Sequence, residues 1–144
     1  MADSKKIIEV LNSWKGTKWM HGVALKGYRA DCGQFVVAVA KELGWIPEDH
    51  KTQIYNRQRA LHCSEDLISA EAERLPGVRR LALGIEALQV GDILVFKTGR
   101  TNGLVGFYIG EERMIHCSIF HGVEEVSLKD PRSGVLTGAW RRED

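Results

Sequence analysis

Asp31-Cys32-Gly33-Gln34-Phe35-Val36 begins the segment of this 144-residue chain from which the fold can be argued. Apolar residues recur here at the i, i+3, i+4, i+7 spacing of one helical face: Cys32, Phe35, Val36, Val39, Ala40 and Leu43. Asp31 is a suitable N-cap, and Gly44 stands where helices commonly end. The segment therefore predicts an amphipathic helix that begins at Cys32.

The position of Cys32 at the head of this helix has a chemical meaning. Backbone N–H groups and the positive end of the helix dipole lie beside the first turn, and both favour a thiolate over a thiol. Only the thiolate is a competent nucleophile. The simpler interpretation is packing, because free cysteine is among the most buried side chains. The segment alone leaves both interpretations open.

Composition sets limits on the class of protein. With 44% hydrophobic and 27% charged residues, the sequence predicts a single soluble domain over residues 1–144. A net charge of +1 gives no reason to expect a nucleic-acid partner. The N-terminal run Met-Ala-Asp-Ser-Lys-Lys lacks the apolar stretch of a signal peptide, and no later run could span a membrane. We therefore expect a chain made in the cytoplasm without a standard export signal and without membrane insertion.

Helix signals dominate the first half of the chain. Ser4 can cap a first helix that closes near Gly16, with Ile7, Leu11 and Trp14 on its apolar face. Residues 16–30 are expected to form a loop. Weaker signals follow, with a helical pattern over 55–61, a helix start at Ser64 and a stop at Pro76-Gly77.

Strand signals dominate the second half. Five runs bounded by turn residues are predicted as strands, at residues 93–96, 104–109, 114–119, 123–128 and 135–140. Gly110 to Arg113 is the expected loop of a hairpin, with the register of a three-residue connection. The pairs Arg79-Arg80 and Arg141-Arg142 are expected at the solvated surface. Helices first and antiparallel strands afterwards predict an α+β domain, with N-terminal helices packed on a C-terminal antiparallel sheet.

The cysteines and histidines give little support for a disulfide framework or a metal site. Three cysteines at irregular spacing argue against paired disulfides. The pairs His62-Cys63 and His116-Cys117 could suggest zinc, but adjacent side chains on a strand point to opposite faces. The C-x-x-C and H-x₃-H spacings of structural zinc sites do not occur. We therefore expect neither a metal nor a cofactor.

Several segments, taken in order, resemble the NlpC-type cell-wall cysteine peptidases. The segments are Trp14-Lys15-Gly16-Thr17-Lys18-Trp19, Lys26-Gly27-Tyr28-Arg29-Ala30-Asp31-Cys32, Gln89-Val90-Gly91-Asp92-Ile93-Leu94-Val95-Phe96, Val105-Gly106-Phe107-Tyr108-Ile109-Gly110 and Met114-Ile115-His116. The match runs from Trp14 to Leu128. The chain is most similar to the short, stand-alone members encoded with bacteriophage tails and gene transfer agents, in which Gly99-Arg100 and Leu61-His62 also recur.

The resemblance implies a papain-like fold and a triad of cysteine, histidine and a third polar residue. Carried over by position, Cys32 is the nucleophile and His116 the third, orienting residue. Asp31 helps to bind the amino end of the substrate, and Trp19 stands where the family usually has a tyrosine lining the site. Gly33 replaces a frequent serine, which removes one expected substrate contact. The implied substrate is a peptidoglycan stem peptide, cut between γ-D-glutamate and a diamino acid.

Leu104 departs from the family pattern at the position of the general-base histidine. The step from Leu104 to His116 is twelve residues, an even number that places both side chains on one face of the hairpin. We expect this face to be the wall that faces the Cys32 helix. Leucine cannot accept the thiol proton, and loss of one member of a nucleophile–base pair typically costs roughly 10³-fold or more in rate.

Three histidines could substitute for the missing base. His116 is the best placed, as a cleft residue, although an ordinary buried strand histidine is the alternative. An orienting residue normally lies one side chain too far from the sulfur, so direct contact requires rearrangement or a bridging water. For His62 and His121, surface or capping roles are favoured.

Two functional hypotheses follow. The first is a peptidoglycan-directed cysteine peptidase, weakened or with rerouted proton transfer, that is carried to the bacterial cell wall on a phage-type tail. The second is a pseudoenzyme, in which the same fold serves as a structural or plug protein bound to a tail hub or tail tip. In the second case Cys32 remains only as a packing residue.

Overall fold

The computed structural model describes residues 4–19, 24–27, 29–30, 32–49, 72–97, 103–118, 120–130 and 134–143. Its elements, in chain order, are α1 (Ser4–Ser13), β1 (Lys18–Trp19), β2 (Ala24–Leu25), β3 (Arg29–Ala30), α2 (Cys32–Glu42), β4 (Val78–Arg80), β5 (Ile93–Lys97), β6 (Gly103–Gly110), β7 (Arg113–Ser118), β8 (Gly122–Ser127) and β9 (Val135–Arg142). The signals predicted at 55–61 and at Ser64 lie outside the described residues.

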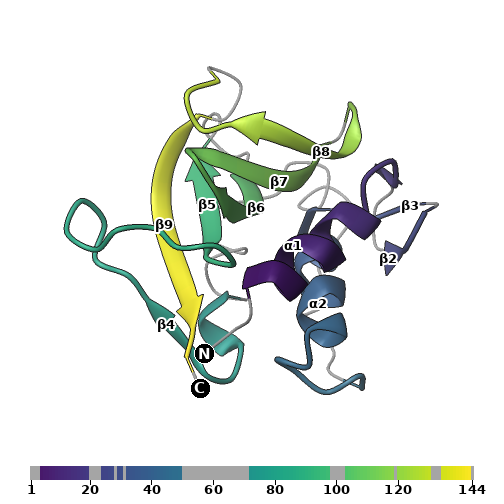
Figure 1. The fold of residues 1–144 in the computed structure, drawn as a ribbon, viewed down its shortest axis with the longest axis horizontal. Helices are drawn as coiled ribbons and strands as arrows, with labels where there is room; N and C mark the ends of the chain where they lie inside the picture. The colour runs from purple at the N-terminus through teal and green to yellow at the C-terminus, as the bar shows by residue number, and fades with distance from the viewer. Residues whose placement is uncertain are drawn as a thin grey trace.

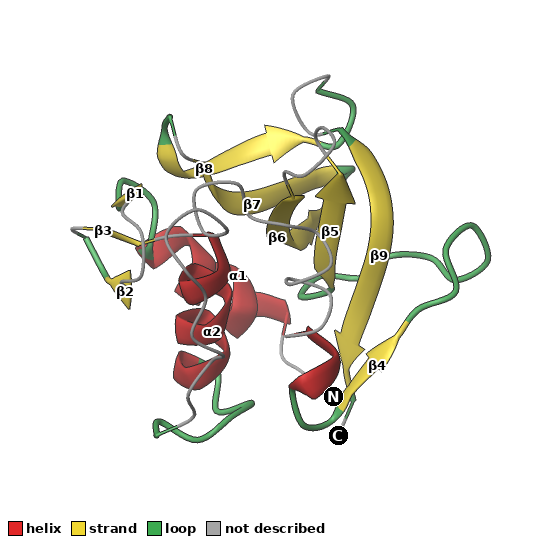
Figure 2. Cartoon of the chain, turned by 180° about the vertical axis from the view of Figure 1, so that it is seen from behind, coloured by secondary structure: helices red, strands yellow, loops and turns green. Residues whose placement is uncertain are grey.

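Helices α1 and α2 lie on one side of a six-stranded sheet, with strand order β4-β9-β5-β6-β7-β8 (Figure 1). Neighbouring strands of this sheet pair antiparallel. A small sheet, in the order β1-β3-β2, lies beside the helices (Figure 2). The predicted α+β architecture, with N-terminal helices packed on a C-terminal antiparallel sheet, is confirmed.

Apolar side chains cover both faces of the large sheet. The cluster on the helix side is centred on Phe35 of α2, whose ring makes edge-to-face contacts with Trp14 (centroids 5.6 Å apart) and Phe107 (6.1 Å). The second cluster, on the other face, contains the buried residues Leu81, Leu94, Phe96, Met114, Val126 and Ala139. Successive residues of β5 therefore alternate between two apolar environments, which explains why 93–96 is a continuous apolar run.

The β6–β7 hairpin has the expected even register, but its turn differs from the predicted one. Glu111 and Glu112 both have positive φ, 53° and 58°, and form a two-residue turn instead of the predicted three-residue connection. A register shift between Tyr108 and Gly110 adds one residue to β6 as a bulge. The turn and the bulge together give the same even register as a three-residue loop.

Four short strands were not predicted. Residues 16–30, expected as a loop, contribute the strands of the small sheet, and Val78–Arg80 forms β4. Elements of two or three residues are too short to show a period in the sequence. The pairing of β1 with β3, and the hydrogen bonds of the residues before β1 to β8, position the head of α2 relative to the large sheet.

Candidate active site

The head of α2 is where the sequence predicts it. The helix begins at Cys32, and β3 ends two residues earlier at Ala30, which pairs with Trp19 of β1. Asp31 and the side chain of Cys32 lie outside the described residues. The roles assigned to these two residues therefore stay predictions.

Backbone hydrogen bonds connect this region to the outer edge of the large sheet. The Val123 N–H of β8 donates to the Thr17 carbonyl (2.7 Å), and the Gly16 N–H donates to the Val123 carbonyl (3.5 Å). A Cβ at Gly122 would collide with the Thr17 carbonyl, and Gly122 has a φ of 71°, so only glycine suits this close approach. The β7–β8 hairpin is thereby fixed to the residues that lead into β1.

These contacts place the head of α2 near one end of β7. Thr17 bonds to β8, β1 follows directly, β1 pairs with β3, and β3 leads into the helix. Adjacent strands lie about 4.8 Å apart, so each step is short. β1 also contacts β7 and β8, and α2 contacts β6 and β7. The end of β7 brought near the helix head is the end that carries His116 and Cys117.

Leu104 and His116 lie on the same face of the sheet, as the even step predicts. His116 pairs with Gly106 across the hairpin, and Leu104 precedes Gly106 by two residues on β6. Leu104 is half-buried and packs against the second apolar cluster. Its side chain offers no proton acceptor.

This shared face is not the wall that packs against α2, and the prediction that it would be is wrong. Val105 and Phe107 point toward the helix cluster, so the alternation of β6 directs Leu104 and Gly106 to the opposite side. The even number of residues between Leu104 and His116 determines that they share a face, but not which face of the sheet packs against α2. A site that joins Cys32 to His116 must therefore lie around the end of the sheet, not between the sheet and α2.

His116 is buried beside a carboxylate that was not singled out in the sequence. Only 4% of the residue is exposed, and it lies directly opposite Glu124 on β8. Its Nε2 is 3.1 Å from Oε1 of Glu124, whose side chain is 22% exposed. On the other side, the absence of a side chain at Gly106 allows close approach of the strands, because a Cβ there would lie 3.0 Å from the His116 Cβ. The predicted strand ends, residues 119 and 123, would have paired His116 with Val126, so the sequence did not identify Glu124.

Trp19 is partly buried and packs against the helix-side cluster. Its indole Nε1 is buried and has no hydrogen-bond partner within the described part of the chain. Phe120, in the turn before β8, is 88% exposed. His121 is also exposed in this turn, as its predicted surface role requires. The predicted lining role of Trp19 is not tested by these contacts.

The next carboxylate on β8, that of Glu125, forms ion pairs with other residues. Glu125 accepts from Nε of Arg113 at 2.6 Å and pairs with Nζ of Lys15 at 3.2 Å. The hydrogen bond from Arg113, followed by that from Lys15, lowers the pKa of Glu125 below its ordinary value of 4.5. Glu124 and Glu125 therefore have different partners, although they are adjacent in the chain.

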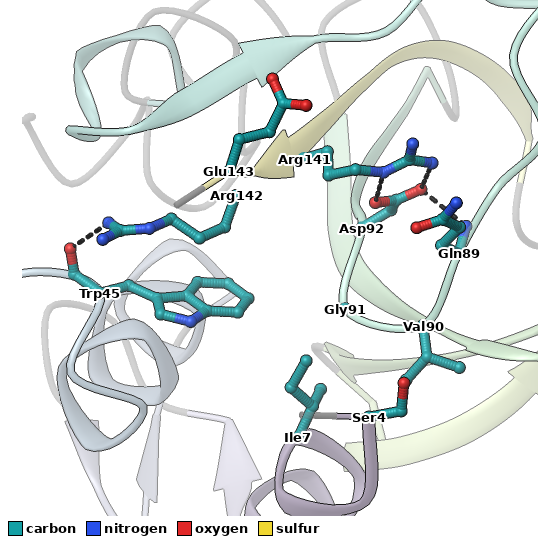
Figure 3. Close-up of a pocket in the computed structure, with 10 residues that line it drawn as sticks. All are labelled: Ser4, Ile7, Trp45, Gln89, Val90, Gly91, Asp92, Arg141, Arg142 and Glu143. Atoms are coloured by element: carbon teal, nitrogen blue, oxygen red, sulfur yellow. Dashed lines mark hydrogen bonds and ion pairs between the residues drawn. The ribbon is translucent and has the colours of Figure 1, made fainter. Parts of the chain in front are cut away.

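A cavity of about 420 Å³ lies between the first turn of α1 and the end of β9 (Figure 3). Asp92, 1% exposed, accepts two hydrogen bonds from Arg141, each 2.9 Å long. The bond to Asp92 raises the pKa of Arg141, and Arg142 donates to the Trp45 carbonyl at 2.6 Å. The prediction that Arg141-Arg142 is solvated surface is wrong, because both side chains tie β9 to the surrounding chain.

None of Trp19, Cys32, Leu104 or His116 is among the residues that line this cavity. Within the described ranges, no three His, Cys, Asp or Glu side chains gather as a metal site. No described helix is both long and apolar enough to cross a membrane.

Known structures share this architecture. An NlpC/P60 family protein from Bacillus cereus ATCC 10987 superposes with a TM-score of 0.66 at 23% identity, over 97% of this chain and 40% of that chain. NlpC1 from Trichomonas vaginalis gives 0.64 at 17% identity, over 97% of this chain and 45% of that chain. The NlpC/p60 domain of the peptidoglycan hydrolase SagA gives 0.60 at 14% identity, over 95% of this chain and 97% of that domain. The chain spans less than half of the first two proteins.

The fold is therefore the papain-like α+β fold of these structures. A comparison with curated proteins found no match. The model of the NlpC/P60 family matches residues 13–141, and the chain belongs to that family.

Proposed function

We propose that this protein is a peptidoglycan-directed cysteine peptidase of the cell-wall hydrolase type. One observation carries the proposal: in an NlpC/P60 domain, α2 begins at Cys32 and backbone pairing brings its head toward the end of β7 where His116 is buried. The likeness to the SagA domain, which belongs to a peptidoglycan hydrolase, supports the choice of substrate.

In this proposal Cys32 is the nucleophile, and a stem peptide is cut between γ-D-glutamate and a diamino acid. Asp31 binds the amino end of the substrate, and Trp19 lines the site. His116 is the histidine of the site, since Leu104 cannot accept a proton. The sulfur forms a thioester with the carbonyl carbon, the amine leaves with the thiol proton, and water then hydrolyses the thioester. Turnover is slow relative to an enzyme with an intact pair of cysteine and base.

We further propose that the protein is carried on a phage-type tail and acts at the bacterial cell wall, with tail hub or tail-tip proteins as partners. The support is the similarity at Gly99-Arg100 and Leu61-His62 to the stand-alone members encoded with phage tails. A tail would bring the protein to the wall from outside the cell.

A second candidate function, a catalytically inactive structural or plug protein of the tail tip, is favoured by the surroundings of Leu104. This side chain packs against an apolar cluster on the face away from α2 and offers no proton acceptor. In this case the domain would bind without cleaving.

The deciding experiment is incubation of the protein with purified peptidoglycan, followed by mass spectrometry of newly formed amino termini. We expect slow cleavage by the wild type and none by Cys32→Ala. Cleavage that survives in Cys32→Ala would reject Cys32 as the nucleophile. If neither protein cleaves but both sediment with tail-tip proteins, the structural role replaces the enzymatic one.

A further inference from the structure

Thr17 is a polar residue that is completely buried, with 0% of its surface exposed. Its N–H donates to the Trp14 carbonyl just after α1 (3.1 Å), and its carbonyl accepts from the Val123 N–H of β8 (2.7 Å). Its Oγ1 accepts from the Gly27 N–H at 2.8 Å. Thr17 therefore joins the end of the first helix and the edge of the large sheet to the turn between β2 and β3.

Only the hydrogen bond to Gly27 depends on the side chain of Thr17. The bonds to Trp14 and Val123 use main-chain groups, which every residue other than proline supplies. Valine has the branched shape of threonine without the hydroxyl, and serine keeps the hydroxyl. The contribution of the side chain can therefore be removed while the two main-chain bonds stay in place.

The Gly27 bond acts on the strand that carries the chain into α2. Gly27 lies between β2 and β3, β3 ends at Ala30, and α2 begins at Cys32. The strands of the small sheet are two residues long, so their pairing supplies few hydrogen bonds (Figure 2). Lys26 of the same turn pairs with Glu42 at the other end of α2, but both side chains are partly exposed and such pairs contribute little. The buried bond from Thr17 is thus the stronger restraint on the turn before β3.

We propose that Thr17 is a positioning residue of the candidate active site, whose hydroxyl oxygen holds the β2–β3 turn and thereby fixes the first turn of α2 relative to β8. The inference rests on the proposed peptidase function, in which Cys32 of this first turn is the nucleophile. The N–H groups of the turn favour a thiolate only while the turn is helical. A displacement of about 1 Å at a reacting group can cost roughly 100-fold in rate. Thr17 acts through the backbone of the helix head and touches no reacting atom.

The effect on the helix head can be measured without turnover. We expect amide hydrogen exchange of β2 and β3 to become roughly tenfold faster in Thr17→Val, because the turn opens more often. The pH at which iodoacetamide alkylates Cys32 at half its maximal rate should rise by about half a unit, as partial loss of a helix-terminus effect requires. A change in access alone would alter the maximal rate but not this midpoint. Thr17→Ser should keep the wild-type values, and Thr17→Ala should repeat the defect.

Thr137→Val is the matched control. The Thr137 hydroxyl of β9 donates to the Val95 carbonyl at 3.3 Å, so the substitution removes the same kind of bond at a distance from α2. Exchange of β3 and the midpoint of Cys32 alkylation should stay as in the wild type. Wild-type exchange with an unchanged midpoint in folded Thr17→Val overturns the inference. Faster exchange with an unchanged midpoint also overturns it, because the effect of the bond would then end at β3.

For stem-peptide cleavage, we expect Thr17→Val to lower kcat by about 10- to 100-fold with a smaller change in KM, and Thr17→Ser to recover most of the loss. A kcat within about twofold of wild type, despite a shifted midpoint, overturns the positioning role. Absence of any Cys32-dependent cleavage in the wild type would instead reject the proposed function, while exchange and alkylation would still decide whether Thr17 fixes the helix head.

Discussion

At the scale of single residues, Leu104 and His116 decide what chemistry is available to the proposed peptidase. Both lie on one face of the β6–β7 hairpin, one apolar and one buried beside a carboxylate. The thiol at Cys32 needs a group that takes its proton and returns it to the leaving amine. In the proposed peptidase, the rate therefore depends on how well His116 does what a histidine at position 104 would do.

A histidine at position 104 should restore the usual arrangement. Leu104→His places an imidazole diagonal to His116 on the same face, where His116 can orient it. We expect stem-peptide cleavage to rise by roughly 10³-fold, in line with the cost of losing a base from such a pair. Release of new amino termini from peptidoglycan measures the gain.

The control is Leu104→His combined with Cys32→Ala, which should show no cleavage. Activity that stays at background in a well-folded Leu104→His protein would mean that position 104 does not meet the sulfur, and that the proposed alignment of the base is mistaken.

How far the site could be predicted follows from these same residues. The even step from Leu104 to His116 gave their shared face, because strand alternation is a property of the chain alone. The face that meets α2 depends on which side of β6 packs against Phe35, and tertiary packing determines that side. Glu124 was missed because its contact with His116 depends on the register across a second hairpin.

At the scale of elements, α2 is a helix whose bounds can be predicted from local sequence alone. Its apolar period, its start at Cys32 and its last residues near Gly44 could all be predicted from short-range rules. The small sheet shows the opposite, since its two-residue strands exist only through pairing with one another. The hairpin of β6 and β7 lies between these cases, because its register was predicted correctly while its turn was not.

The head of α2 should make Cys32 the most reactive of the three thiols. N–H groups and the helix dipole favour its thiolate, whereas Cys117 is only 3% exposed. We expect iodoacetamide to label Cys32 faster than Cys63 and Cys117 below pH 7.5, as measured by peptide mapping over time. Labelling of Cys32 and Cys63 at equal rates would favour the packing interpretation of Cys32.

At the scale of the whole molecule, one ion-pair network ties the helical layer to the edge of the sheet. Lys15 follows α1, Glu125 lies on β8 and Arg113 on β7. The pKa of Glu125 is lowered in the folded state, so its contribution to stability is present above the ordinary value of 4.5 and is lost as pH falls through the folded pKa. The pairs are partly exposed, so we expect a contribution of about 0.2–1 kcal/mol.

Glu125→Gln should therefore lower the free energy of unfolding at pH 7 by this amount and have a smaller effect at pH 3, as measured by urea denaturation. Glu112→Gln, which removes a carboxylate that pairs with Lys129 and is 63% exposed, is the control and should cost less at pH 7. An equal loss at both pH values for Glu125→Gln would contradict the electrostatic explanation.

The helices and the sheet share one apolar cluster, and we expect residues 1–144 to unfold as one unit. Trp14, Trp45 and Trp140 are all buried in this cluster, so tryptophan fluorescence reports on both layers. The fluorescence and far-UV circular dichroism transitions in urea should coincide. Two separated transitions would show that the helical and β parts are independent domains.

The position of β9 has a consequence for how the nascent chain acquires its structure. β9 lies between β4 and β5, and β4 pairs with β9 (Figure 1). β4 is therefore synthesised long before its partner leaves the ribosome, and one side of β5 stays without its neighbour for the same time. Assembly of the sheet must wait for the last strand to emerge, and an interrupted translation product would expose a strand edge on which other chains could aggregate.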